Sequence, residues 1–350
     1  QATHLLPTDD SSIPRVLIRV GSVPLYAARS KRTYRAVITV ALCAIIALAG
    51  FPASANGGPS PLSGMPKGEG QPVVMVKYGN ARPDRPHYGL NQADLIYVEE
   101  VEWGLTRIAA MFNSRFPAIA GPTRSARVSD LEILEQFDSP GLVFSGANDV
   151  LLKAVRKSNA ISLSPSERSN FYYRNLSKEV PHNQLVRLAS LINREKKLGV
   201  VKDIGFIFER AIPAGGVKTS TFRALWPSAE VSGKWTKSGW QISFDGSLHR
   251  DAQTKGLLTP RTVVLQFAEH KESAYGDRFG GKTPLVKTVG SGRAIVLRNR
   301  QRFEAEWSRA SAESGTTFAV DGAVLPFDVG QVFVVLVDAK AKKGTVNVGG

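Results

Sequence analysis

Short apolar runs alternate with helix-like patterns through the middle of this sequence, and this alternation restricts the fold more than any other feature. The runs are short enough to be strands buried on both faces, and they lie at Val73–Val76, Asp94–Val98, Arg107–Phe112, Gly141–Phe144 and Ile204–Phe208. Between them, apolar side chains repeat at three- and four-residue spacing over Leu131–Phe137, Val150–Val155 and Leu185–Ile192. The pattern predicts an α/β domain over residues 72–210, with a mixed sheet and flanking helices.

The pattern changes after residue 210, where helical periodicity nearly vanishes. Alternating or continuously apolar segments follow one another, separated by turn residues such as Asp245-Gly246. They lie at Thr219–Leu225, Trp235–Phe244, Thr262–Glu269, Leu285–Val289, Arg293–Arg298, Phe303–Trp307, Thr316–Val320 and Gln331–Asp338. Residues 211–350 are therefore predicted to form a β-rich C-terminal domain.

The N-terminal part contains an export signal. Four basic residues between Arg29 and Arg35 precede the apolar run Ala36–Phe51, and the small-residue sequence Ala53-Ser54-Ala55 follows it. This is the layout of a secretory signal, with cleavage expected after Ala55. The run is shorter than the roughly 20 residues of a stable span, but an uncleaved anchor remains an alternative, as does a buried core helix.

This signal defines the remaining segments of the chain. Residues 36–55 are the signal peptide or anchor, and residues 1–35 are an extension that we leave out of the fold. Residues 56–71 are rich in Gly, Pro and Ser and are predicted to be a flexible linker. We therefore expect an extracytoplasmic protein, either secreted or tethered to the membrane by an uncleaved N-terminal helix.

Composition excludes several classes of protein. Of the 350 residues 43% are hydrophobic and 21% are charged, which is typical of a globular chain and not of a disordered one. The single cysteine, Cys43, excludes disulfide frameworks and cysteine zinc sites. The five histidines are far apart in sequence, without HExxH spacing, so no metal site and no cofactor are expected. The net charge of +15 favours polyanionic partners or anionic surfaces.

One sequence matches the phosphate-loop pattern GxxxxGK[ST] letter for letter. It runs from Gly276 to Thr283, but such a loop needs a helix to begin at its Lys-Thr end. Pro284 and an extended apolar run follow instead. We therefore predict a glycine-rich hairpin loop rather than a nucleotide site.

The segment Gly121–Arg127 (GPTRSAR) is a candidate anion site. It precedes a predicted helix that begins near Ser129, so Arg124, Ser125 and Arg127 lie beside a helix N-terminus. Arginine side chains suit phosphate or carboxylate groups. The alternative is that both arginines pair internally with the acidic residues of Glu99–Glu102.

Two further junctions between predicted strands and helices carry polar residues. Asn148 and Asn183 precede helical patterns, and helix capping alone explains them. In an open α/β sheet, however, the loops at the carboxyl ends of strands gather in one crevice. If the three junctions share that edge, Arg124, Arg127, Asn148 and His182 converge, and His182 becomes the acid/base candidate.

The strand-like segment Asp94–Arg107 carries the candidate carboxylates. Glu100 and Glu102 point to the same side if the strand continues through them. Paired carboxylates perform acid/base chemistry or hold a hard cation, so Glu102 and Asp94 are the candidate partners of His182. They can equally neutralise Arg107 and Arg124 without any chemistry.

The chain resembles the YerB-like lipoprotein family, which is defined by domain of unknown function 3048. The most specific shared elements are GPxRSAR at Gly121–Arg127 and PHN at Pro181–Asn183. Further shared residues are Pro61–Gly64, Ala81–Pro83, Gly89-Leu90, Ala93-Asp94, Tyr97, Glu102, Gly104, Thr106-Arg107, His249, Asp251, Ala294 and Glu306-Trp307. The resemblance implies a two-domain envelope protein and brings no established reaction or ligand.

Two positions depart from the family pattern. Ser145 stands where such proteins tend to carry histidine after the fourth strand. Leu42 before Cys43, with the apolar run continuing after it, makes a poor lipidation site. The second departure weakens the expectation of a lipid anchor in this chain.

Three classes of function follow from these features. The first is binding of an anionic envelope polymer by Arg107, Arg124 and Arg127, with Ser125, Asn148 and Asn183 beside them. The second is a hydrolase or transferase that acts on such a polymer, with His182 as the acid/base and Glu102 or Asp94 as its carboxylate. The third is a structural partner of another envelope protein. Nucleic acid is not an expected partner, since the export signal argues against it.

Overall fold

The computed structural model describes residues 57–276 and 280–350. The predicted signal or anchor, the cleavage position after Ala55 and the extension 1–35 lie outside the described residues. No helix in the described ranges is both long and apolar enough to cross a membrane.

A large mixed sheet organises the structure, in the order β19-β18-β17-β16-β13-β20-β2-β3-β1-β4-β5 with β8 beside β17. Its N-terminal strands are β1 (Val74–Gly79), β2 (Leu95–Glu100), β3 (Thr106–Phe112), β4 (Gly141–Val143) and β5 (Ile161–Ser162). Its C-terminal strands are β8 (Val217–Lys218), β13 (Thr262–Ala268), β16 (Gly290–Arg298), β17 (Gln301–Arg309), β18 (Thr317–Val320), β19 (Ala323–Val324) and β20 (Val332–Asp338).

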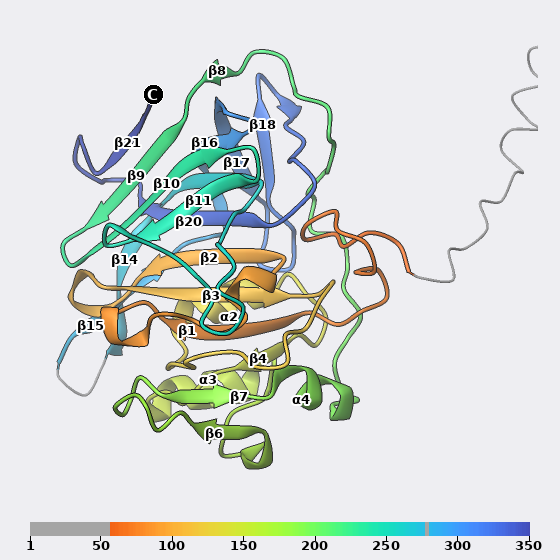
Figure 1. The fold of residues 1–350 in the computed structure, drawn as a ribbon, viewed down its shortest axis with the longest axis vertical. Coiled ribbons are helices and arrows are strands. Elements are labelled where there is room, and N and C mark those ends of the chain that lie inside the picture. Colours follow the sequence, from red (N-terminus) through yellow and green to blue (C-terminus); the bar gives the residue numbers. More distant parts are fainter. Residues whose placement is uncertain (1–56, 277–279) are drawn as a thin grey trace, which may run out of the picture. The chain divides into compact units, whose positions relative to one another are not determined.

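The two predicted domains share this sheet. β20 runs parallel to β2, with Leu95 opposite Val332 and Val98 opposite Val335, and in Figure 1 the blue β20 lies directly above the orange β2. β1 is antiparallel to β3 but parallel to β4, so the N-terminal part has a mixed sheet as predicted. The C-terminal part is rich in β-structure, also as predicted.

The remaining strands form a second sheet and two hairpins. The second sheet, in the order β12-β11-β10-β9-β21, contains β9 (Thr221–Trp226), β10 (Ala229–Thr236), β11 (Gly239–Phe244), β12 (Ser247–Leu248) and β21 (Val346–Gly349). The hairpins pair β6 (Tyr172–Arg174) with β7 (Gln184–Val186), and β14 (His270–Gly276) with β15 (Lys282–Val286). The glycine-rich segment therefore joins two antiparallel strands, and Lys282 begins a strand instead of a helix.

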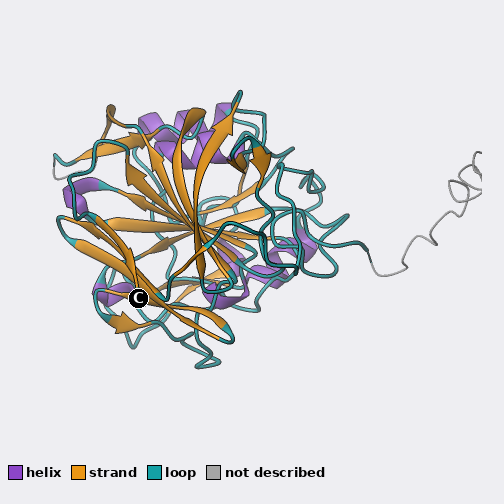
Figure 2. Cartoon of the chain, turned by 90° about the horizontal axis from the view of Figure 1, so that it is seen from above, coloured by secondary structure: helices purple, strands orange, loops and turns teal. Residues whose placement is uncertain are grey.

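Helices cover both faces of the main sheet (Figure 2). In the described part of the chain the α-helices are α2 (Val128–Leu134), α3 (Asp149–Lys157) and α4 (Leu188–Arg194). Four short 3-10 turns accompany them: η1 (Arg82–Asp84), η2 (Leu90–Gln92), η3 (Glu102–Gly104) and η4 (Ser169–Phe171).

Two apolar cores fill the space on the two sides of the sheet. On one side Leu134 of α2 and Leu151 of α3 pack with Met75 of β1. On the other side Leu188 of α4 and Trp240 of the second sheet belong to the core that contains Val76. β1 and β3 are buried along their whole length because both faces are covered. β17 instead alternates buried and exposed residues along most of its length, as a half-exposed strand does.

One predicted helix begins later than expected, and one predicted strand is wrong. The helix predicted over Leu185–Ile192 begins only at Leu188, because Gln184–Val186 pairs as a strand with β6. Ile204–Phe208 is not a strand; its backbone pairs only at Phe327, while Phe206 and Phe208 pack their rings against that residue.

The segment predicted as a linker is packed in its described part, residues 57–71. Leu62 is fully buried, and the Ser63 hydroxyl donates a hydrogen bond to Asp94. Gly68 lies so close to Ser60 that a Cβ atom there would be 2.2 Å from the serine Cβ. These contacts fix the segment against the body of the protein instead of leaving it as a free tether.

Candidate functional site

The three polar junctions lie side by side at the carboxyl end of β1. Arg124 N donates to Lys77 O of β1 (2.8 Å), and Thr123 N donates to Gln184 O, directly after the PHN element (2.8 Å). The loop after β4 joins them, since Ser145 N donates to Arg124 O (3.0 Å). β1 and β4 are parallel, so their carboxyl ends meet at one edge, as the sequence argument requires.

Nine ionisable side chains gather at this edge, and we call them the charged cluster. Four are cationic, four are carboxylates and one is a histidine. They are Lys77, Arg107, Arg124, Arg127, Asp84, Glu99, Glu102, Asp130 and His182. The acids and bases match in number, so the cluster is charge-balanced while His182 is neutral.

Asp84 connects two of the predicted site residues. Its Oδ1 atom lies 2.8 Å from Arg124 Nη1 and 2.7 Å from His182 Nδ1, and its Oδ2 atom accepts from Ala81 N (3.0 Å). The carboxylate is fully buried, whereas the side chains of Arg124 and His182 are 16% and 23% exposed. The two partly exposed side chains are thus held side by side against a buried acid.

The hydrogen bonds to Asp84 fix the tautomer of His182. An ionised carboxylate can only accept, so the proton must sit on His182 Nδ1. Arg124 Nη1 lies 3.0 Å from the same nitrogen, but two donors cannot bond each other; both point at the one carboxylate oxygen. Nε2 makes no hydrogen bond to any described residue and is left to accept a proton or to meet a ligand.

Asp84 remains ionised in spite of its burial. Burial by itself would raise the pKa of this carboxyl group, but Arg124, the hydrogen bond from His182 and the nearby Arg107 together hold the pKa below its ordinary value. Its position also depends on a glycine, because a Cβ atom at Gly79 would lie 2.2 Å from the Asp84 carboxyl carbon. β1 therefore ends in a residue that leaves room for the acid.

Arg127 and Glu102 form a second pair deeper in the cluster. Arg127 Nε and Nη2 donate to Glu102 Oε2 at 3.1 and 2.6 Å, and Thr283 of β15 donates to the other oxygen. Only 4% of the Glu102 side chain is exposed. This pairing is the internal alternative that the sequence left open, and here it is realised for Arg127.

Arg107 is buried without an ion pair among the described residues. Its Nη1 donates to Thr106 O (3.2 Å), while its Nε has no partner. Burial, together with the like charges of Arg124 and Arg127, lowers the pKa of Arg107 to about 10, against the raising effect of Asp84 and Glu102. The guanidinium nevertheless stays protonated at pH 7 and adds positive potential beneath Arg124.

Lys77, Glu99 and Asp130 form the innermost part of the cluster. Lys77 Nζ contacts Glu99 Oε1 and lies 2.7 Å from Asp130 Oδ1, and all three side chains are buried. Burial lowers the pKa of Lys77 to about 8, against the raising effect of Asp130. Asp130 Oδ2 also accepts from Arg127 N (2.6 Å), which fixes the start of α2.

Three predicted site residues, Asp94, Asn148 and Asn183, have structural roles. Asp94 lies at the opposite end of β2 from Glu102, where both its oxygens accept hydrogen bonds from Ser63, Asn113 and Ser114. Asn148 caps α3 through Leu151 N (2.8 Å).

Asn183 is also structural. It is buried, accepts from Arg174 and donates to Lys178 O, and it does not cap a helix, since a strand follows it. Ser125 differs from these three: it is partly exposed beside Arg124, and its hydroxyl bonds to no described residue.

Sequence reasoning missed three members of the cluster. Asp84 directly follows Ala81-Arg82-Pro83, an element shared with the family, but the sequence pattern does not single it out as a site residue. Lys77 is the one charge within the apolar strand VMVKYG, and an isolated lysine in a strand buried on both faces signals a buried partner. Asp130 stands three residues after Arg127 at a helix start, where an acid is common.

Comparison with known families identifies the two halves of the chain. Residues 62–201 match the family described as "Protein of unknown function (DUF3048) N-terminal domain". Residues 226–334 match its C-terminal domain. The chain belongs to the DUF3048 family. Both halves of the family's architecture are present, and all nine residues of the charged cluster lie within the first.

A sequence match and a structure match, both to YerB of Bacillus subtilis, give further context. Over 71 residues the chain is 38% identical to a Bacillus subtilis (strain 168) protein named "Putative lipoprotein YerB"; this stretch is 20% of the chain and 21% of the relative, about a fifth of each. The crystal structure of the YerB protein from Bacillus subtilis has a similar fold, with a TM-score of 0.71 and 20% identity, over 83% of this chain and 99% of that one. The structural similarity supports the fold alone.

Proposed function

We propose that this DUF3048 protein binds an anionic polymer of the cell envelope, and that Arg124 and His182 are the groups that contact it. The observation that carries the proposal is their shared position above buried Asp84 at the exposed end of the charged cluster. A buried acid that fixes the partly exposed Arg124 preorganises it for an anion, and His182 adds a second donor when its Nε2 also carries a proton.

Donor capacity separates Arg124 from the other two arginines. Arg127 uses Nε and Nη2 on Glu102, and Arg107 is almost fully buried. Arg124 commits only Nη1, to Asp84; its Nε and Nη2 make no bond to any described residue and neither is fully buried. These N–H groups, with the Ser125 hydroxyl beside them, are available to a phosphate or carboxylate.

The location outside the cytoplasm is part of the proposal. The N-terminal apolar run with its basic flank supports export, and the related Bacillus protein is named a lipoprotein. The net charge of +15 suits the polyanions found at such surfaces. A partner-module role would use arginines that are all paired internally, so the free donors of Arg124 favour binding.

The binding test uses poly(glycerol phosphate) as the probe. Arg124→Ala should weaken its binding about ten- to hundredfold, because a charge-assisted contact is worth about 1.5–3 kcal/mol. Binding by the parent should also weaken as ionic strength rises. Calorimetric titration measures both effects.

Arg168→Ala is the matched control, since Arg168 is a partly exposed arginine paired with Glu195 outside the cluster. It should bind the probe as the parent does. Equal affinity of Arg124→Ala and the parent, or equal losses in the two variants, would contradict the proposal.

Turnover of the polymer is the second candidate function, and the Asp84–His182 hydrogen bond favours it. With Nδ1 protonated, Nε2 is a general base held in position by a carboxylate. In this enzymatic alternative the carboxylate that bonds to His182 is Asp84, in place of the predicted Glu102 or Asp94. An enzyme should release fragments from the probe, and His182→Gln should abolish that release while leaving most of the binding. A pure binder releases none.

A further inference from the structure

We infer that a second site, independent of the proposed anion site, binds an uncharged sugar residue in a cavity between the η1 turn and the second sheet. The cavity has a volume of about 500 Å³, within the usual range for small-molecule sites. Its walls come from Asn80–Arg82, Leu105-Thr106, Trp226–Glu230 and Asp245. None of the nine residues of the charged cluster lines it.

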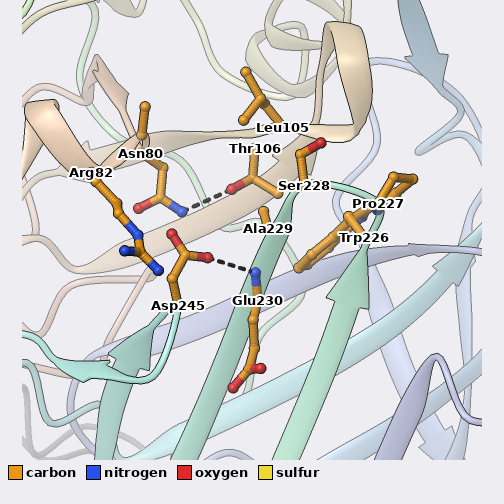
Figure 3. Close-up of a pocket in the computed structure, with 11 residues that line it drawn as sticks. Asn80, Arg82, Leu105, Thr106, Trp226, Pro227, Ser228, Ala229, Glu230 and Asp245 are labelled. Atoms are coloured by element: carbon orange, nitrogen blue, oxygen red, sulfur yellow. Dashed lines mark hydrogen bonds between the residues drawn. The ribbon is translucent and has the colours of Figure 1, made fainter.

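The two sides of the cavity differ in character (Figure 3). Asn80, Arg82 and Asp245 lie on one side, and Trp226 lies with Pro227 on the other. A sugar ring has the same division, since its C–H face packs on aromatic rings and its hydroxyl groups bond to planar polar side chains. Trp226 is only partly buried, so part of its ring is open to such a contact.

Asn80 supplies a polar group without a partner. Only 5% of the residue is exposed, and its Nδ2 donates to Thr106 Oγ1 (2.8 Å) while its Oδ1 has no hydrogen bond. Turning the amide over only exchanges the two atoms, so one of them remains unpaired in either orientation. A buried amide group without a partner is destabilising, and a ligand hydroxyl or amide would satisfy it once the side chain turns its buried Oδ1 atom toward the cavity.

Two more groups on this wall have spare hydrogen-bonding capacity. Thr106 Oγ1 accepts from Asn80 and can still donate its own proton. The Arg82 side chain forms no hydrogen bond or ion pair within the described ranges, although it lines the cavity. Together the wall offers both donors and acceptors, which is what a hydroxyl or acetamido group requires.

Charge around the cavity is largely balanced by internal pairs. The acids that line it are already bonded: Asp245 accepts from Arg85 and from Glu230 N, and the Glu230 carboxylate pairs with Arg223. Arg82 is thus the one charged side chain of the lining without an ion pair in the described part of the chain, and its guanidinium can donate to sugar hydroxyl groups. The occupant is assigned as a saccharide by Trp226, whose aromatic face suits the C–H face of a sugar ring, and not by the charge of the lining.

The test is calorimetric titration of the purified protein with the neutral trimer of N-acetylglucosamine. The parent should bind it, and both Trp226→Ala and Asn80→Ala should weaken binding at least tenfold. Trp235→Ala is the matched control, because Trp235 packs on Trp240 and Arg261 and does not line the cavity. It should bind like the parent, as should Arg124→Ala, which separates this site from the anion site.

Either of two results would overturn the inference. One is a folded parent that does not bind the trimer, whether or not it binds poly(glycerol phosphate). The other is trimer binding that survives both cavity variants or falls equally in Trp235→Ala. Far-ultraviolet circular dichroism of each variant verifies that the fold is intact before affinities are compared.

Discussion

Replacing Lys77 by methionine is expected to lower the free energy of unfolding by about 3–5 kcal/mol at pH 7. Lys77 is the cation between the buried carboxylates of Glu99 and Asp130, and methionine keeps the length of the side chain without its charge. Glu99 then loses its ion-pair partner, and its Oε2 atom already has no hydrogen bond. Urea denaturation of the parent and the variant measures the difference.

Lys202→Met is the control for this loss. Lys202 pairs with Asp138 at 3.1 Å, but 36% and 73% of the two side chains are exposed. An exposed pair contributes about 0–1 kcal/mol, so this variant should unfold almost like the parent. A loss in Lys77→Met no larger than in Lys202→Met would contradict the buried charged network.

The pH dependence of Lys77→Met has a definite sign. The pKa of Lys77 is lowered from 10.5 to about 8 by burial, so between these values the unfolded chain binds more protons than the folded one. The contribution of Lys77 therefore makes the free energy of unfolding rise with pH from about 8 to about 10.5. The variant should lack this rise, which the difference between the two stability curves isolates.

Arg127→Ala is expected to cost about 3–5 kcal/mol of stability, whereas Arg124→Ala should cost only about 1–2 kcal/mol. Removing Arg127 leaves Glu102 buried with the Thr283 hydroxyl as its remaining partner. Removing Arg124 leaves Asp84 with His182 and Ala81 N still bonded to it. Thermal melting of the two variants under the same conditions compares them.

The order of the two losses distinguishes scaffold from site. In the proposed site Arg127 mainly stabilises the fold, whereas Arg124 contacts the ligand. If Arg124→Ala melts as far below the parent as Arg127→Ala does, Arg124 is also a scaffold residue and the proposed anion site loses its main contact.

Local sequence patterns predicted most strands, because a strand buried on both faces has a continuous apolar run and a half-exposed strand alternates apolar and polar residues. The apolar runs at β1, β3 and β13 are buried throughout, and β17 shows its alternation. The start of the helix predicted from Leu185 was wrong, because the three-residue spacing of Leu185 and Leu188 fits a helix although Leu185 lies in a strand. Only the pairing of Gln184–Val186 with β6, a tertiary contact, decides that this stretch is a strand.

The joining of β20 to β2 lay beyond sequence reasoning. The two strands are more than 200 residues apart in the chain, and nothing in LIYVEE or VFVVLVD specifies the neighbour of either. Both are apolar along most of their length, so either one could have lain next to several other strands. The sharing of one sheet by both halves follows from this long-range pairing.

The candidate site was predicted in its location but not in its pairing. The convergence of Arg124, Arg127 and His182 follows from the topology of strand ends, which sequence patterns indicate. Which acid pairs with which base depends on the positions of the side chains in the folded protein. Asp84 reaches His182 only because Gly79 leaves room for it. Glu100, another candidate, instead lies 3.3 Å from His270 Nδ1.

The most direct test of the anion site is nuclear magnetic resonance of the arginine and histidine side chains during titration with poly(glycerol phosphate). We predict saturable shifts of the Arg124 guanidinium and His182 imidazole signals, with the Arg107 and Arg127 signals nearly unchanged. Saturable binding that shifts neither Arg124 nor His182 would contradict the account and place the binding site elsewhere on the protein.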